Sequence, residues 1–180
     1  MVKALVINLE NCLGCRLCEM VCSAKHQGVI NPYRSRIRVI VKDRDWEGIP
    51  TTCVQCEDAQ CASVCPVKAI TRDAVLGRLV INYDRCIGCR MCITACPFGF
   101  MTFDFIDKKV IKCDLCDGEP QCAKFCAHQA IEYLDVSDLG VAKRRITGEK
   151  LSAYVRGNIR NVASVPAEID AKFSGSNRPT

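Results

Sequence analysis

Short apolar stretches, each bounded by polar residues or glycine, predict brief strands and helices along this chain. The clearest is 36–42, R-I-R-V-I-V-K, where apolar and basic residues alternate as in a strand with one solvated face. Other expected strands are 79–82, 101–105 and 109–112, and the expected short helices are 16–24 and 90–95. These elements predict an α+β fold.

The pattern also repeats. Residues 5–18, L-V-I-N-L-E-N-C-L-G-C-R-L-C, read almost like 79–92, L-V-I-N-Y-D-R-C-I-G-C-R-M-C. Self-similarity of this kind indicates an internal duplication. We therefore expect two tandem copies of one module, about residues 2–72 and 78–134, with an insertion in the first copy.

Sixteen cysteines form four groups with the spacing C-x2-C-x2–5-C-x3-C. Three cysteines at this spacing can wrap one iron–sulfur cluster, while the fourth points away to ligate a neighbouring cluster. The groups are Cys12, Cys15, Cys18, Cys22; Cys53, Cys56, Cys61, Cys65; Cys86, Cys89, Cys92, Cys96; and Cys113, Cys116, Cys122, Cys126. The sequence therefore predicts four [4Fe–4S] clusters, with every cysteine a ligand, in a chain that conducts electrons.

Disulfides and structural zinc are the two alternatives to iron–sulfur clusters. Repeated C-x2-C places thiols too close along a loop for sound disulfide geometry, and a reducing compartment would oppose oxidation. Zinc sites with four cysteines usually separate two C-x2-C pairs by a longer stretch. The run of three thiols two residues apart, typical of bacterial ferredoxins, favours iron–sulfur clusters over both.

The charge of the chain has to be corrected for its clusters. The formal net charge is +5, but each oxidised cluster with its thiolates carries about −2, which leaves the loaded protein at about −3. Basicity is thus no argument for a nucleic-acid partner, and none is expected. Basic residues beside the cysteine loops either offset cluster charge, which would raise the cluster potentials, or form a solvated surface. They are Arg16, Lys25, Lys68, Arg85, Arg90, Lys112 and Lys124.

The sequence shows no signal-peptide pattern and no apolar run near the ~20 residues of a membrane span. We therefore expect a cytoplasmic protein without a membrane span. No nucleophile–base arrangement or glycine-rich phosphate loop is recognisable, so neither catalytic residues nor a bound nucleotide is expected. His128, two residues after Cys126, either tunes a cluster by hydrogen bonding or is a surface histidine. Trp46 is either a docking residue or part of a small packing cluster.

The four cysteine groups resemble those of the four-cluster electron-transfer subunits of molybdenum and tungsten oxidoreductases and of related polyferredoxins, over about residues 2–134. The resemblance implies two tandem bacterial-ferredoxin-like halves, in which the first group pairs with the fourth and the second with the third. Pro66 and Pro97 follow the fourth cysteines of the central groups as the ferredoxin pattern expects, whereas Ser23 and Ala127 replace this proline in the outer groups. The implied ligand sets are Cys12, Cys15, Cys18 with Cys126; Cys113, Cys116, Cys122 with Cys22; Cys53, Cys56, Cys61 with Cys96; and Cys86, Cys89, Cys92 with Cys65.

The segment 113–122, C-D-L-C-D-G-E-P-Q-C, looks most like the small iron–sulfur subunits that accompany tungsten aldehyde oxidoreductases. The resemblance implies a non-catalytic subunit of an anaerobic oxidoreductase. It would relay single electrons between a catalytic subunit with a tungsten or molybdenum cofactor and a flavin/NAD subunit or ferredoxin. The alternatives are a diffusible polyferredoxin, a ferredoxin-type subunit of a hydrogenase, formate dehydrogenase or carbon monoxide dehydrogenase, and a zinc-stapled interaction module.

The last cysteine is Cys126, and we divide the chain into a four-cluster body, 1–135, and a C-terminal arm, 136–180. In the arm, Leu151, Val155 and Ile159 recur at helical spacing. The arm cannot bury this apolar stripe alone, so it is predicted to contact another subunit, either the catalytic partner or a second copy of this chain. The alternative is an arm folded back on its own body.

Overall fold

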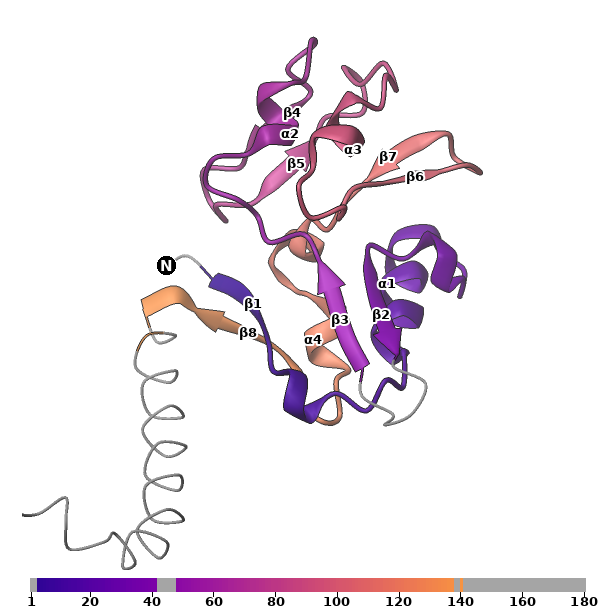
Figure 1. The fold of residues 1–180 in the computed structure, drawn as a ribbon, viewed down its shortest axis with the longest axis vertical. Helices are drawn as coiled ribbons and strands as arrows, with labels where there is room; N and C mark the ends of the chain where they lie inside the picture. The colour runs from indigo at the N-terminus through magenta and orange to yellow at the C-terminus, as the bar shows by residue number, and fades with distance from the viewer. Residues whose placement is uncertain (1–2, 42–47, 138–139, 141–180) are drawn as a thin grey trace, which may run out of the picture. The chain divides into compact units, whose positions relative to one another are not determined.

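The computed structural model describes residues 3–41, 48–137 and 140, which form short strands and helices (Figure 1). The strands are β1 Lys3–Ile7, β2 Ile37–Val41, β3 Gly48–Thr52, β4 Ile70–Arg72, β5 Leu79–Ile81, β6 Thr102–Asp104, β7 Lys109–Ile111 and β8 Ile131–Asp135. The helices are α1 Leu17–Gln27, α2 Gln60–Ser63, α3 Met91–Ala95 and α4 Gln121–Lys124, with 3₁₀ turns η1 Leu9–Asn11, η2 Pro32–Arg34 and η3 Leu115–Gly118. The α+β class is confirmed, and each of the four expected strands is present, shorter than predicted by one or two residues.

Helix α1 is longer than α3, although the two begin at equivalent points of the repeat. Cys96, the residue before Pro97, is extended with ψ 111°, because proline disfavours the helical conformation in the residue before it. Ser23 stands at the equivalent position of the first copy, so α1 continues for 11 residues and ends at Gly28, which is left-handed at φ 68°. The departure of Ser23 from the proline pattern therefore explains the longer helix.

Four antiparallel sheets of two strands each, β1–β8, β2–β3, β4–β5 and β6–β7, make up the β-structure of the described residues. In the first of them Ile7 lies opposite Ile131, and in the second Ile37 lies opposite Thr52. An isolated pair of strands is marginally stable in water. These pairs therefore need support from the loops and helices packed beside them.

The pairing crosses between the two sequence copies. Strand β1, from the first copy, pairs with β8 from the second, and α1 packs on α4. Likewise β4 pairs with β5, and α2 packs on α3. Figure 1 shows the result as two groups of elements: a terminal lobe of β1, α1, β2, β3, α4 and β8, and a central lobe of α2, β4, β5, α3, β6 and β7. Each lobe is therefore built from elements of both sequence copies.

Each lobe has its own buried apolar core, and cysteines form part of both. The terminal core consists of Cys22, Ile37, Cys122 and Ile131. The central core consists of Ala59, Ile70, Leu79, Cys92, Met101 and Val110. The cores and the cysteine groups are therefore one and the same region of the fold.

A buried ion pair joins the lobes. Arg34 of η2 donates from Nε to Asp104 Oδ2 on β6 at 2.8 Å. Burial alone would raise the pKa of Asp104, but the Arg34 guanidinium and the backbone N–H groups of Ile106 and Asp107 hold it below its ordinary value. Asp104 is therefore ionised at neutral pH, and it links η2 to the β6–β7 turn.

Two sequence predictions lie outside the described residues. Trp46 lies in the segment 42–47, and almost all of the C-terminal arm lies beyond residue 140. The compact unit that contains all of the strands and helices above ends at Val136. Of the residues that the structure describes, no helix has the length and hydropathy required to cross a membrane.

Candidate metal centres

The central lobe brings the second and third cysteine groups together around two cavities. The first, of about 270 Å³, is lined by Cys53, Cys56, Cys61 and Cys96, and the second is lined by Cys65, Cys86, Cys89 and Cys92. Each cavity is lined by three cysteines of one group and by the fourth cysteine of the other. The family resemblance implies the same crossing for the ligand sets of the central groups, and these ligand sets stay a prediction.

The terminal lobe brings the first and fourth groups together through helix packing. Cys22 on α1 and Cys122 on α4 lie in one buried core, and Cys18 and Cys126 pack against it. Burial is the main cause that raises the pKa of Cys122, and the thiolates of Cys113, Cys22 and Cys116 add to the rise. Burial is also the main cause for Cys18, whose pKa is raised further by Glu19 and then by Cys15 and Cys12. The outer groups therefore meet at the packed faces of α1 and α4.

The repeated sequence produces the same backbone in equivalent cysteine loops. Gly14 and Gly88 have φ of 68° and 69°, a left-handed conformation that glycine adopts without steric cost. Arg16 and Arg90, each just before a helix, are also left-handed, with φ of 58° and 64°. Both loops thus turn tightly between the first and third cysteines.

Strand β3 closes over the first cysteine loop. The Gly48 N–H donates to the Cys12 carbonyl at 3.1 Å. A Cβ atom at Gly48 would lie 2.6 Å from Cys12 Sγ and 2.6 Å from Gly14 Cα, so no larger residue fits without moving the loop. The strand that returns from the insertion therefore forms one wall of this site.

Backbone N–H groups point at the sulfur of several fourth cysteines. Ala69 donates to Cys65 Sγ at 3.2 Å, and Ala130 donates to Cys126 Sγ at the same distance of 3.2 Å. The hydrogen bond to the fourth cysteine is therefore the same with Ala127 after it as with Pro66. These bonds stabilise negative charge on sulfur.

The buried thiols are suited to binding a metal cluster. Burial raises the pKa of Cys18 to about 12 and the pKa values of Cys92 and Cys116 to about 11, and neighbouring thiolates add to the rise. Four thiolates gathered in one place therefore need a strongly positive group, and coordinated metal ions deprotonate thiols outright. The donor set, its spacing and the cavities with four cysteines all fit [4Fe–4S] clusters.

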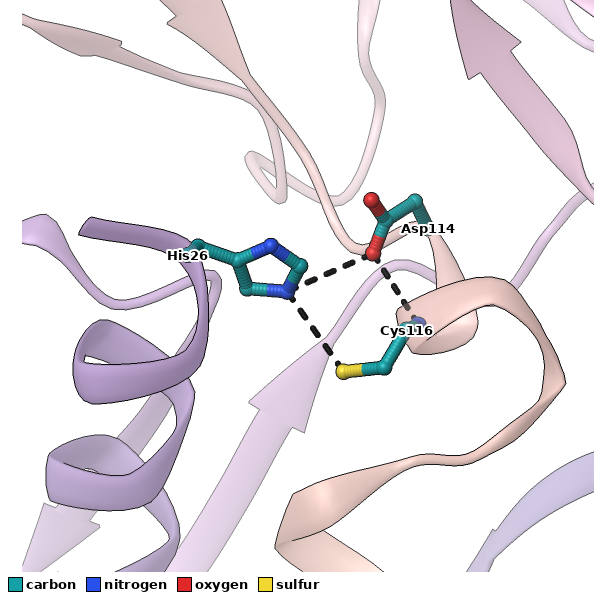
Figure 2. A group of neighbouring side chains, drawn as sticks. All are labelled: His26, Asp114 and Cys116. Carbon is teal, nitrogen blue, oxygen red and sulfur yellow. Dashed lines mark hydrogen bonds and ion pairs between the residues drawn. The ribbon is translucent and has the colours of Figure 1, made fainter. Parts of the chain in front are cut away.

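His26, which lies outside the cysteine motifs, is beside a cysteine of the fourth group. Its Nε2 is 3.4 Å from Cys116 Sγ and 3.4 Å from Asp114 Oδ1 (Figure 2). The Asp114 carboxylate also accepts the Cys116 N–H at 3.0 Å and pairs with Arg36. The three donor atoms are close enough to hold a single metal ion. Because Cys116 lies in a cluster motif, we interpret His26 and Asp114 as groups that surround a cluster ligand.

The neighbours of His26 determine which ring nitrogen carries the hydrogen. A carboxylate and a thiolate are both acceptors, so Nε2 carries the hydrogen. Burial and the nearby Arg36 lower the pKa of His26, which favours the neutral ring. His26 follows Cys22 by four residues on α1, so the two share one face of the helix. This spacing is the feature of the sequence that could have predicted a histidine near the cluster ligands. His128, the candidate from sequence, is exposed.

We expect His26→Leu to lower the potential of the cluster that Cys116 ligates by roughly 40 mV, the one-electron equivalent of a hydrogen bond of about 1 kcal/mol. Redox titration of the anaerobic protein, followed by electron paramagnetic resonance, measures the shift. His128→Leu at the exposed position is the control. Equal potentials in wild type and His26→Leu would show that the contact has no electronic effect.

The fold and the cysteine groups together define a ferredoxin-type iron–sulfur protein. A family model described as a 4Fe–4S dicluster domain matches residues 44–136, and one described as a 4Fe–4S binding domain matches residues 9–25. The chain belongs to this 4Fe–4S dicluster family of ferredoxin-type electron-transfer subunits of oxidoreductases. Its sixteen cysteines lie in binding motifs consistent with four [4Fe–4S] clusters, as predicted.

Named relatives agree with this class. The chain is 42% identical over 128 residues to the polyferredoxin-like subunit of aliphatic sulfonate oxidoreductase from Pyrococcus furiosus, covering 70% of this chain and 72% of that protein. It is 41% identical over 146 residues to the putative electron transport protein YsaA of Escherichia coli, covering 74% and 90%. It is also 32% identical over 172 residues to formate hydrogenlyase subunit 2 of Escherichia coli, covering 74% and 83%.

Proposed function

We propose that this chain is the electron-transfer subunit of a cytoplasmic oxidoreductase complex. It relays single electrons between a catalytic subunit with a tungsten or molybdenum cofactor and a flavin/NAD subunit or ferredoxin. Tungsten aldehyde oxidoreductase is the catalytic partner that we would look for first. The observation that carries the proposal is the gathering of sixteen cysteines into crossed groups on one small fold. The similarity to a polyferredoxin-like subunit of an oxidoreductase supports the subunit role.

We also propose the four ligand sets implied by the family resemblance. The two cavities lined by four cysteines each support the sets of the central groups. The buried pair Cys22 and Cys122, and the packing of Cys18 and Cys126 on the same core, support the sets of the outer groups. In this arrangement each cysteine group supplies three ligands to one cluster and one to its neighbour.

Bound clusters supply one-electron oxidation and reduction, and the residues of the chain determine where this occurs. Buried cysteines such as Cys22 and Cys122 exclude water from the terminal core. Cys15 and Cys89, at equivalent positions of the repeat, are exposed. Donor and acceptor proteins can therefore approach closely at the first and third cysteine loops.

Anaerobic purification from the native organism tests the proposal. We expect a brown protein with about sixteen irons and as many sulfides per chain, together with a catalytic subunit that contains tungsten or molybdenum. Removal of residues 141–180 should weaken this association and leave the iron content unchanged, because we propose that the arm contacts the partner. Recovery of the full-length chain alone, fully loaded, would contradict the subunit role and favour a diffusible carrier. A colourless protein containing zinc would contradict the cluster assignment.

The second candidate is a ferredoxin-type subunit of a complex that oxidises formate or hydrogen. The similarity to formate hydrogenlyase subunit 2 favours it. The two candidates differ in the substrate that the purified complex uses to reduce a viologen dye. An aldehyde supports the tungsten enzyme as partner, whereas formate or hydrogen supports the second candidate.

A further inference from the structure

Lys112 differs from the other basic residues beside the cysteine loops. It is 2% exposed. The other basic residues of this set are all exposed: Arg16, Lys25, Lys68, Arg85, Arg90 and Lys124. A lysine is almost never fully buried unless its charge is paired. The burial of this one ammonium, directly before Cys113, must therefore have a structural cause.

Three oxygen atoms surround Lys112 Nζ. It donates to the backbone carbonyl of Cys113 at 2.7 Å and to that of Leu79, and the third acceptor is Gln55 Oε1 at 3.4 Å. An ammonium has three N–H donors, whereas a neutral amine has two and would turn its lone pair toward one of these oxygens. The arrangement therefore fits the charged form of Lys112.

Gln55 is itself held in one orientation. Its Oε1 accepts the Leu79 N–H at 2.8 Å, and its Nε2 donates to the Cys113 carbonyl at 2.8 Å. Gln55 also has a left-handed backbone with φ 54°, which a residue other than glycine adopts at some cost. Such a conformation persists where surrounding contacts hold it. The oxygen end of the amide is thus fixed toward Lys112.

The Lys112 ammonium lies between two cysteine groups. It follows β7 and donates to the carbonyl of Cys113 in the fourth group, and its acceptor Gln55 lies between Cys53 and Cys56 of the second group. Burial lowers the pKa of Lys112, and the thiolates of Cys53, Cys113 and Cys61 oppose that shift. The charge is therefore shared by groups from both lobes.

Carboxylates near Lys112 pair with arginines instead. Asp114 pairs with Arg36, while Asp73 and Asp117 pair with Arg78 at 3.1 Å and 2.6 Å. The three acceptors that hold the ammonium are uncharged oxygens. The groups that bind Lys112 therefore do not neutralise its positive charge, which is left to act on the cysteine groups on either side.

We propose that Lys112 is an electrostatic positioning residue that raises the potentials of two clusters, those whose first three ligands come from the second and fourth cysteine groups. The inference rests on the ligand sets proposed above. Reduction adds one negative charge to a cluster, and a buried cation beside it is screened little by salt. The two clusters beside Lys112 therefore accept an electron more readily than they would without it.

The position of Lys112 also distinguishes inner from outer clusters. Exposed Cys15 and Cys89 belong to the first and third groups, whereas Lys112 lies between the second and fourth. An electron that enters through either exposed loop is therefore drawn toward the two clusters beside Lys112.

Redox titration of the loaded full-length protein, followed by electron paramagnetic resonance, tests the proposal. Lys112→Met removes the charge and keeps the length of the side chain, Lys112→Arg keeps the charge, and Lys124→Met removes an exposed charge as the control. At a fixed solution potential, Lys112→Met should shift the reduced-to-oxidised ratio of two of the four clusters at least tenfold toward oxidised, equivalent to about 59 mV. In Lys112→Arg the cluster potentials should stay close to the wild-type values. In Lys124→Met all four potentials should equal those of the wild type.

A second variant serves if Lys112→Met fails to load its clusters. Gln55→Glu keeps an oxygen beside Lys112 but adds a negative charge, so it should lower the potentials of the same two clusters. Four unchanged potentials in a fully loaded Lys112→Met or Gln55→Glu protein would overturn the proposal. Equal shifts in the potentials of all four clusters would also overturn it, because they would indicate that the whole fold had loosened. These potentials belong to the isolated chain, so failure to find a catalytic partner would not affect the outcome.

Discussion

Replacement of Cys22 with serine should reduce the iron content from about sixteen to about twelve per chain and destabilise the protein by at least about 4 kcal/mol. Cys22 is 6% exposed and packs with Cys122, Ile37 and Ile131. It also accepts the Arg36 N–H at 3.3 Å. The variant would bury a hydroxyl in an apolar core and remove a cluster ligand where the two ends of the body meet. Loss of this one sulfur should therefore loosen the pairing of β1 with β8 as well as one loop.

Cys89→Ser is the matched comparison. Cys89 is exposed and belongs to the third group, so its replacement should remove a similar amount of iron without placing a hydroxyl inside a packed core. Iron analysis and thermal melting followed by circular dichroism, both under anaerobic conditions, measure the two effects separately. We expect Cys22→Ser to melt well below Cys89→Ser. Equal melting temperatures would mean that Cys22 has no role beyond holding a cluster.

Removal of iron should unfold both lobes together. Every sheet of the described residues has two strands, and α2 and α4 have four residues each. Five of the buried apolar side chains are themselves cysteines: Cys22, Cys92, Cys113, Cys116 and Cys122. With so few other apolar contacts, the free energy of cluster binding is also the free energy of folding.

Chelation under reducing conditions, followed by circular dichroism and hydrogen exchange, measures this loss. We expect loss of the cooperative melt and its return when iron and sulfide are restored. An apo protein with a native spectrum and a cooperative melt would contradict the prediction.

Cysteine spacing was sufficient to predict the cofactor class, because three ligands of each cluster lie within one short loop. The duplication predicted equivalent loops, and Gly14 and Gly88 do share one conformation. Local sequence also accounts for the lengths of α1 and α3 through Ser23 and Pro97. The crossed pairing of the groups was expected from the family resemblance rather than from local pattern, because it joins segments that lie far apart along the chain.

Ligand type and spacing are local properties, so the order of the residues was enough to identify an iron–sulfur electron carrier with an internal repeat. The groups that surround the sulfur atoms became known only from the folded chain. His26 approaches Cys116 across the α1 face, Gly48 closes over Cys12, and Lys112 is buried while six similar cations are exposed. Burial and contacts between distant segments depend on how the lobes pack, so they cannot be predicted from the spacing of residues along the chain.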